Sequence, residues 1–284
     1  MKRFSEKPKE NKRPLEMKDI QKVSLEILKF VTEICERNGF RYSLMYGTLI
    51  GAIRHKGYIP WDDDVDIMMP RPDYEKFLEY VRNHKEDMGV YEIFNESTHK
   101  DYLYTITRVS DSRYEIFKDD EKNCGMGIFI DVYPYDGLGD DYDKALDMLR
   151  RTRRLCDIIV DITRTRHNPS SMNWRGQAVM KLKRMVNSCL GLNYFRKKLT
   201  LASRIYDYDK SEFVGPAVWY FTNPKKVLFR RSMFDDLVKV PFEDGEFYVP
   251  ADYDSLLSQE YGNYMQLPPP EKRIYQHQYK AYRK

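Results

Sequence analysis

The chain has 284 residues, of which 48 are basic and 44 acidic, for a formal net charge of +4. This near balance argues against a general nucleic-acid binder, and the mean hydropathy of -0.70, with no run near the ~20 apolar residues that span a bilayer, excludes a multi-span membrane protein. The four cysteines lie far apart without a CxxC pair, and the N-terminal residues lack the apolar core of a secretory signal. We therefore expect a cytoplasmic protein with neither a disulfide framework nor a zinc site.

The first half of the chain is predicted to form a mixed domain. Residues 1–13 are rich in Lys, Glu and Pro and predict a flexible tail. Apolar residues at helical spacing predict a helix over 15–37, ended at Asn38-Gly39. The elements predicted after it are a strand over 40–45, a short helix over 47–54, a strand over 64–69, a helix from Pro72, strands over 90–94, 102–109 and 113–117, and a strand over 127–133 ended by Pro134. This order predicts an α+β core over 14–139, in which a mixed β-sheet is flanked by helices.

The composition changes after this core. Residues 140–212 have a helical pattern and many Lys and Arg, which is typical of a solvated helix face and also of a surface that meets an anionic polymer or a membrane. Residues 213–284 return to a mixed pattern and are predicted to pack on the core as a C-terminal α/β segment. The elements predicted there are short strands near Val240 and Phe247 and a helix near 252–261 that the run Pro268-Pro269-Pro270 breaks.

The most informative stretch is YGTLIGAIRHKGYIPWDDDVDIMMP, residues 46–70. Its aspartates Asp62, Asp64 and Asp66 are spaced by two, which on a strand places the three carboxylates on one face. Carboxylates this close resist ionisation unless a cation lies among them, and hard oxygen ligands suit Mg²⁺ or Mn²⁺. We therefore predict a site for Mg²⁺ (or Mn²⁺), with an acidic turn in solvent as the alternative.

A pair of small residues precedes this stretch of acids. Gly47 and Thr48 lie between a predicted strand and a short helix, where glycine lets a phosphate approach the backbone and the helix N-terminus offers unpaired N–H groups. Arg54 and Lys56 follow and can supply positive charge to a diphosphate. We predict these four as substrate-binding residues, with a simple helix cap as the alternative for Gly47-Thr48.

A further acid, Asp131, lies in the apolar run GIFIDVYP, where a carboxylate is costly unless it has a partner. A metal shared with Asp64 and Asp66 would be such a partner, and a structural hydrogen bond is the alternative. We predict that Asp62, Asp64, Asp66 and Asp131 are catalytic, and that Asp64, Asp66 and Asp131 are the metal ligands.

These parts together resemble a known arrangement. A strand, a Gly-Thr turn into a helix, a D-x-D strand and a later third Asp are similar to the nucleotidyltransferase fold. More closely, YGTLIGAIRHKGYIPWDDDVDIMMPRPDYEKF resembles the LicD/fukutin family of phosphocholine-type transferases. The resemblance continues in the 125–138 region, at GIFIDVYPYDGL, and over 240–273, so it covers most of the chain.

The resemblance implies roles for particular residues. By position, Asp64 and Asp66 match the D-x-D metal ligands of the family, and Asp62 matches the preceding acid. Asp131 fits the third carboxylate, as a metal ligand or as the group that accepts the proton of a sugar hydroxyl.

The phosphate-binding turn of the family is matched by Gly47 and Thr48, and its following basic residue by Arg54. Family members use a CDP-activated alcohol, such as CDP-choline, CDP-ribitol or CDP-glycerol, move the phospho-alcohol to a glycan hydroxyl and release CMP. Tyr248 and Tyr253 are expected to contact choline or sugar.

We therefore predict a cytoplasmic, metal-dependent transferase that moves a phospho-alcohol, most simply phosphocholine from CDP-choline, to a cell-surface glycan precursor of the lipopolysaccharide, teichoic acid or capsule type. The basic helices would make peripheral contact with the membrane surface, and no nucleic acid is expected as a partner. One alternative is a nucleotidyltransferase that releases pyrophosphate. The other is a non-catalytic glycan-binding module, against which the intact aspartates argue.

Overall fold

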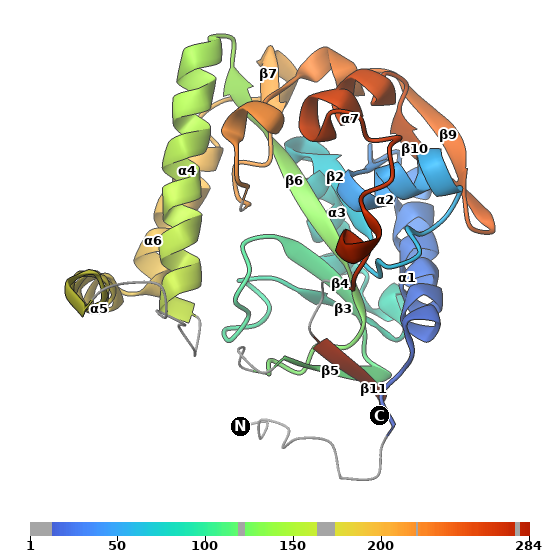
Figure 1. The fold of residues 1–284 in the computed structure, drawn as a ribbon, viewed down its shortest axis with the longest axis horizontal. Helices are drawn as coiled ribbons and strands as arrows, with labels where there is room; N and C mark the ends of the chain where they lie inside the picture. Colours follow the sequence, from blue (N-terminus) through green and yellow to red (C-terminus); the bar gives the residue numbers. More distant parts are fainter. Residues whose placement is uncertain (1–12, 119–122, 164–173, 220, 276–278) are drawn as a thin grey trace.

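The computed structural model describes residues 13–118, 123–163, 174–219, 221–275 and 279–284 (Figure 1). All but the last residue of the predicted tail lies outside these ranges. Within them the molecule combines a central mixed sheet with helices on its faces, which confirms the predicted α+β class. The predicted domain boundaries at 139 and 212 stay predictions.

A mixed sheet forms the centre of the core. Its strands lie in the order β1-β2-β6-β4-β3, of which β2 and β6 are parallel and the other pairs antiparallel. The bounds of these strands are Ser43–Leu44 (β1), Asp66–Pro70 (β2), Phe129–Gly139 (β6), Thr107–Asp111 (β4) and Tyr91–Phe94 (β3). Every residue of β2, β4 and β6 is buried, so these central strands carry the core on both faces.

Strand β6 runs through Pro134, where the sequence predicts its end. The N–H of Asp131 donates to the Val65 carbonyl on the β2 side at 2.8 Å, so by alternation the nitrogen of Pro134 faces the opposite edge. On that edge β4 pairs only as far as Val132, and β7 (Phe213–Gly215) pairs with β6 from Asp136 onward. Proline therefore lies in the gap between two partner strands and no ladder hydrogen bond is lost there.

The helices of the core largely follow the predicted pattern. Helix α1 (Met17–Asn38) buries one apolar face and ends at Gly39, whose φ of 67° is the left-handed conformation that glycine adopts freely. Helix α2 (Tyr46–Ile50) continues as one π-helical turn over Gly51–His55. Helix α3 (Arg71–Asn83) begins at the end of β2, and a short 3₁₀ turn over Lys85–Met88 precedes β3.

Three helices follow the sheet and confirm the helical prediction for the basic segment. They are α4 (Tyr142–Thr163), α5 (Trp174–Leu190) and α6 (Leu192–Ser203). Figure 1 shows them beside one another on one side of the sheet, with α5 at the outer edge. No helix in the described part of the chain is both long and apolar enough to cross a bilayer.

The C-terminal segment closes over the opposite side of the sheet. Strands β9 (Leu237–Phe242) and β10 (Gly245–Pro250) form a hairpin, and α7 (Tyr253–Tyr261) follows it. This helix ends at Gly262, before the proline run that the sequence predicts as its breaker. The remaining elements are β8 (Phe229–Arg230) beside β7, β11 (Tyr279–Arg283) paired with β5 (Tyr114–Lys118), and 3₁₀ turns over Tyr208–Lys210, Pro224–Lys226, Arg231–Phe234 and Pro270–Lys272.

Candidate active site

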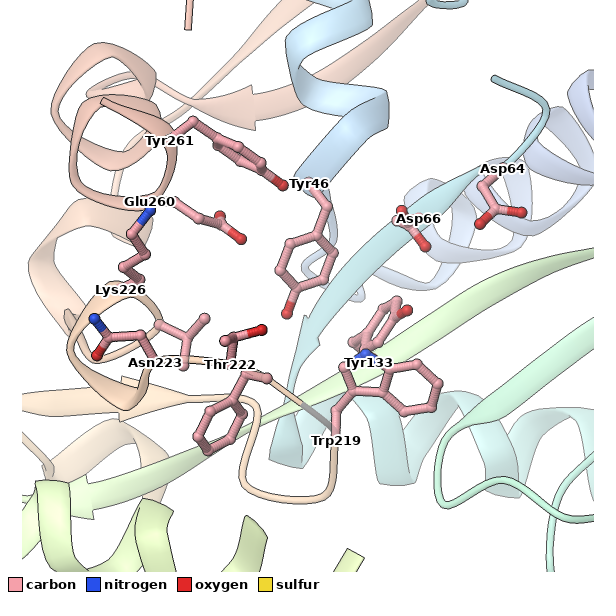
Figure 2. Close-up of a pocket in the computed structure, with 12 residues that line it drawn as sticks. Tyr46, Asp64, Asp66, Tyr133, Trp219, Thr222, Asn223, Lys226, Glu260 and Tyr261 are labelled. Carbon is pink, nitrogen blue, oxygen red and sulfur yellow. The ribbon is translucent and has the colours of Figure 1, made fainter. Parts of the chain in front are cut away.

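Two cavities meet above the carboxyl-rich start of β2. The first has a volume of about 410 Å³ and the second about 420 Å³, and both are lined by Asp64, Tyr133 and Trp219. We call the first the acidic cavity (Figure 2), and its lining residues are Tyr46, Asp64, Asp66, Tyr133, Trp219, Phe221, Thr222, Asn223, Lys226, Val227, Glu260 and Tyr261. We call the second the arginine cavity, because Arg108 and Lys118 line it together with Tyr104, Phe129 and Asp131.

The predicted aspartates enter this region from a turn rather than from one strand. Only Asp66 belongs to β2, so the prediction that Asp62, Asp64 and Asp66 share one strand face is wrong. The Asp64 N–H donates to Asp62 Oδ1 at 3.5 Å, a local turn that Asp side chains favour over strand pairing. Asp64 and Asp66 nevertheless both line the acidic cavity, as Figure 2 shows, whereas Asp62 lines neither cavity.

Gly47 and Thr48 hold this turn in place. A Cβ on Gly47 would lie 3.0 Å from Asp62 Oδ2, so the absence of a side chain lets the carboxylate approach. The buried Thr48 hydroxyl accepts a hydrogen bond from the Asp66 N–H at 2.9 Å and donates to the Asp64 carbonyl at 3.4 Å. Both residues therefore position the aspartates, and their predicted contact with a phosphate stays a prediction.

Arg54 and Lys56 line neither cavity. Arg54 donates to the Tyr264 carbonyl at 2.5 Å, and burial lowers the pKa of its guanidinium. Lys56 ends the π-helical turn with a φ of 61°, and its carbonyl accepts a hydrogen bond from the Glu243 N–H at 2.9 Å. The structure thus gives both residues local contacts, and their role toward a diphosphate stays a prediction.

Asp131 is engaged in a buried ion pair that the sequence did not indicate. Arg108 donates from Nε to Asp131 Oδ1 at 2.6 Å and from Nη2 to Oδ2 at 3.4 Å, and the two side chains are only 5% and 6% exposed. The guanidinium also lies 3.7 Å from the ring centroid of Tyr104 and 4.0 Å from that of Phe129. Burial raises the pKa of Asp131, although Arg108 opposes that shift.

The residues present fit a divalent ion through two carboxylates. Asp64 and Asp66 share a cavity wall, and Mg²⁺ commonly takes one or two protein carboxylates and fills its other positions with water and phosphate oxygens. Among the described residues no three His, Cys, Asp or Glu side chains are grouped so that they could hold a metal ion. Asp131 binds Arg108 and does not form a three-carboxylate cluster with Asp64 and Asp66. Its role as a third metal ligand stays a prediction.

The far wall of the acidic cavity carries a group that sequence reasoning missed. Glu260 on α7 is 9% exposed, and its Oε2 has no hydrogen-bond partner among the described residues. Burial raises the pKa of Glu260 to about 8. No local signal marks it, because a Glu in the helical stretch YDSLLSQEY is typical of a solvated face.

Aromatic rings form a continuous wall between the two cavities. Tyr46 and Tyr133 pack edge to face with centroids 5.0 Å apart, and Tyr133 and Trp219 do the same at 5.3 Å. Tyr46 has a φ of 53°, a strained conformation for a residue with a Cβ, which is more frequent at functional sites than elsewhere. The tyrosines predicted to contact substrate, Tyr248 and Tyr253, line neither cavity.

Comparison with known proteins identifies the class of this site. The family model described as the LicD/FKTN/FKRP nucleotidyltransferase domain matches residues 39–154, which include Asp64, Asp66, Arg108 and Asp131. The lipopolysaccharide cholinephosphotransferase LicD of Haemophilus influenzae is 30% identical over 280 residues, which are 94% of this chain and 98% of that protein. An uncharacterized protein of Rickettsia typhi is 36% identical over 126 residues, which cover 44% of this chain and 37% of that protein.

The chain therefore belongs to the LicD family, as its motifs predict. The prediction that it is an enzyme of the transferase class is confirmed with it. The family model ends before Trp219 and Glu260, so the far wall of the acidic cavity comes from a part of the chain outside that model.

Proposed function

We propose that the protein transfers phosphocholine from CDP-choline to a hydroxyl of a cell-surface glycan precursor, of the lipopolysaccharide, teichoic acid or capsule type, and releases CMP. The observation that carries the proposal is the relationship, over nearly both full lengths, to the Haemophilus protein named a lipopolysaccharide cholinephosphotransferase. The pair Asp64 and Asp66 on the wall of a cavity supports it, and so does a mixed sheet of the kind expected for a nucleotidyltransferase-like fold.

Asp64 and Asp66 are the proposed ligands of Mg²⁺ (or Mn²⁺). When bound, such an ion would offset the negative charge that develops on the diphosphate oxygens and on the leaving CMP. The chain contributes the position of the two carboxylates, because Thr48 accepts from the Asp66 N–H and donates to the Asp64 carbonyl. Gly47 contributes by leaving room for the Asp62 carboxylate beside this turn.

The arginine cavity suits the nucleotide part of the donor. Lys118 supplies positive charge there, since the charge of Arg108 is compensated by Asp131, and Trp219 supplies a ring surface on which a base can stack. Asp64, which lines both cavities, lies where the diphosphate of a donor spanning them would be.

In the proposed reaction the acceptor oxygen attacks the phosphorus that carries choline. A new P–O bond to the glycan forms, the P–O bond to CMP breaks, and CMP leaves with the bonding electron pair. We assign the hydroxyl proton to Asp131, which lines the arginine cavity beside Asp64. Arg108 fixes the orientation of that carboxylate through its two hydrogen bonds.

Phosphorus NMR of the purified protein with Mg²⁺ and CDP-choline tests the proposal. We expect the diphosphate resonances to disappear and CMP to appear, slowly with water as acceptor and faster with a suitable glycan. Consumption of CTP with release of pyrophosphate, while CDP-choline stays intact, would instead show that the protein is a nucleotidyltransferase.

A further inference from the structure

The acidic cavity has two walls of different character. Figure 2 shows Asp64 and Asp66 on one side and Glu260 with Lys226 on the other, with Tyr46 between them. The rest of the lining is rich in aromatic rings, namely Tyr133, Trp219, Phe221 and Tyr261. A carboxyl group thus faces Asp64 and Asp66 across a space that five aromatic rings line.

The burial of Glu260 is energetically unfavourable. A carboxyl oxygen removed from water without a hydrogen-bond donor is unfavourable unless a cation compensates it, and Oε2 has no such donor among the described residues. Lys226 lines the same cavity, and its charge and a hydrogen bond with Tyr261 both favour the ionised form of Glu260, but burial outweighs them and raises the pKa of this carboxyl. The mechanism proposed above makes no use of this carboxyl.

A quaternary ammonium ion matches both properties of this wall. It carries a full positive charge but no N–H, so proteins recognise it by the faces of aromatic rings and by a nearby negative charge rather than by hydrogen bonds. We propose that the acidic cavity is a cage for the trimethylammonium group of choline, with the rings of Tyr46, Trp219 and Tyr261 as its walls and Glu260 as the counter-charge. The bound cation favours the ionised carboxylate, so Glu260 releases its proton to solvent when choline enters. This inference rests on the proposed function, and it names the part of the site that selects the alcohol.

The charge of the two cavities then fixes the direction of the donor. The nucleotide end lies in the arginine cavity beside Lys118, and the cationic end lies in the acidic cavity beside Glu260. A donor carrying a neutral polyol, such as CDP-glycerol, would leave Glu260 without a cation.

The sharpest probe is a pair of donors that differ only in charge. CDP-choline is compared with the CDP ester of 3,3-dimethylbutanol, in which carbon replaces the quaternary nitrogen and the shape is kept. For the wild-type protein we expect CDP-choline to bind on the order of tenfold more tightly in calorimetry, because only it is attracted by the rings and by Glu260. The ratio of the two affinities is measured within each variant, so a general loss of folded protein cancels.

Three variants at the cavity and two remote controls complete the test. Glu260→Gln and Tyr261→Leu should each bring the affinity ratio close to one while leaving the neutral donor bound as before, and Tyr261→Phe, which keeps the ring, should preserve the ratio. The matched controls are Glu79→Gln on the exposed face of α3 and Tyr194→Leu on α6, both remote from the cavity and both expected to leave the ratio unchanged.

The outcomes separate this inference from the proposed function. If CDP-choline is turned over to CMP but Glu260→Gln and Tyr261→Leu keep the wild-type ratio, the cage assignment is wrong and the proposed function stands. If Glu260→Gln lowers kcat equally for both donors without changing either affinity, Glu260 acts on the reacting hydroxyl and the cage is again wrong. If neither donor binds or yields CMP with wild-type protein, the proposed function itself fails.

Discussion

Arg108 and Asp131 lie directly opposite one another on the antiparallel strands β4 and β6, and their side chains form a buried ion pair. On its other side Asp131 is in register with Asp66 on the parallel strand β2. One row across three neighbouring strands therefore carries two carboxylates and one guanidinium. The guanidinium compensates one carboxylate of the row, and Asp66 is left to face the acidic cavity.

Replacing Arg108 with an uncharged residue should strongly destabilise the folded protein. Arg108→Met leaves Asp131 buried without its partner, and such broken buried pairs cost about 3–5 kcal/mol. We expect the free energy of unfolding, measured by chemical denaturation, to fall by this amount. The double variant Arg108→Met with Asp131→Asn should recover much of the loss, since no charge is then left buried. A double variant no more stable than the single one would show that the ion pair is not the source of the effect.

The two cavity aspartates should be needed for turnover but not for folding. Asp64→Asn and Asp66→Asn each remove a carboxylate ligand of the proposed ion, for which we expect a loss on the order of 10³-fold in rate. Thermal melts should stay near that of the wild type, because asparagine keeps the shape and the backbone hydrogen bonds to Thr48.

The control for this pair is Asp147→Asn, which alters an exposed aspartate on α4. Its rate should equal that of the wild type. Rates within tenfold of wild type for both Asp64→Asn and Asp66→Asn would remove these residues from the metal-binding role.

Most of the fold could be predicted where a local pattern decides it. Helix α1 has apolar residues at helical spacing and a glycine just beyond its end, so both its face and its stop follow from the sequence. The start of β2 could not be predicted, because Asp62 bonds to the backbone of its own turn and delays the strand to Asp66. The continuation of β6 through Pro134 depends on where its neighbours begin and end, which no local pattern reveals.

The site residues also differ in whether a local sequence pattern predicts them. Asp64 and Asp66 belong to a compact motif and could be recognised from the sequence. Glu260 comes from a helix almost two hundred positions further on, and only the packing of α7 beside α2 brings it to the cavity of Asp66. The role of Arg108 could not be predicted from the sequence either, because it depends on the register of β4 with β6 rather than on neighbouring residues in the chain.

The raised pKa of Glu260 predicts a pH-dependent stability. In the unfolded chain a glutamate ionises near its ordinary pKa of about 4.3, whereas the folded protein holds the proton of Glu260 to about pH 8. Stability that the protonated group contributes is therefore present at low pH and is lost as the pH rises through this window. The charged or titratable groups around Glu260 include Lys226, Tyr261, Tyr46 and Tyr135, and Asp64 and Asp66 lie across the same cavity.

Glu260→Gln tests this dependence in the absence of ligand. Glutamine cannot ionise, so the stability of the variant relative to wild type should increase by about 3–4 kcal/mol between pH 5 and pH 8. Chemical denaturation at the two pH values measures the difference, with Glu79→Gln as the matched control. An equal effect of Glu260→Gln at both pH values would show that the folded-state pKa is not raised.

The outer helix of the basic segment offers a surface for a membrane. Leu182, Met185, Val186 and Leu190 share one face of α5 and are each more than half exposed, at 57%, 60%, 51% and 53%. Lys183 and Arg184 lie in the same turns, and Figure 1 shows α5 at the edge of the molecule. Exposed apolar residues flanked by basic ones are typical of helices that lie in the headgroup region of an anionic bilayer.

We therefore expect the protein to sediment with vesicles that contain anionic lipid and not with vesicles of phosphatidylcholine alone. Raising the salt concentration should weaken the association, because screening removes the attraction of the basic side chains. Met185→Ser with Val186→Ser should weaken it at every salt concentration, since the apolar contribution is lost, while CMP release in solution stays unchanged. Absence of binding to anionic vesicles at low salt would mean that this face of α5 is only solvated, which is the simpler interpretation of its charge.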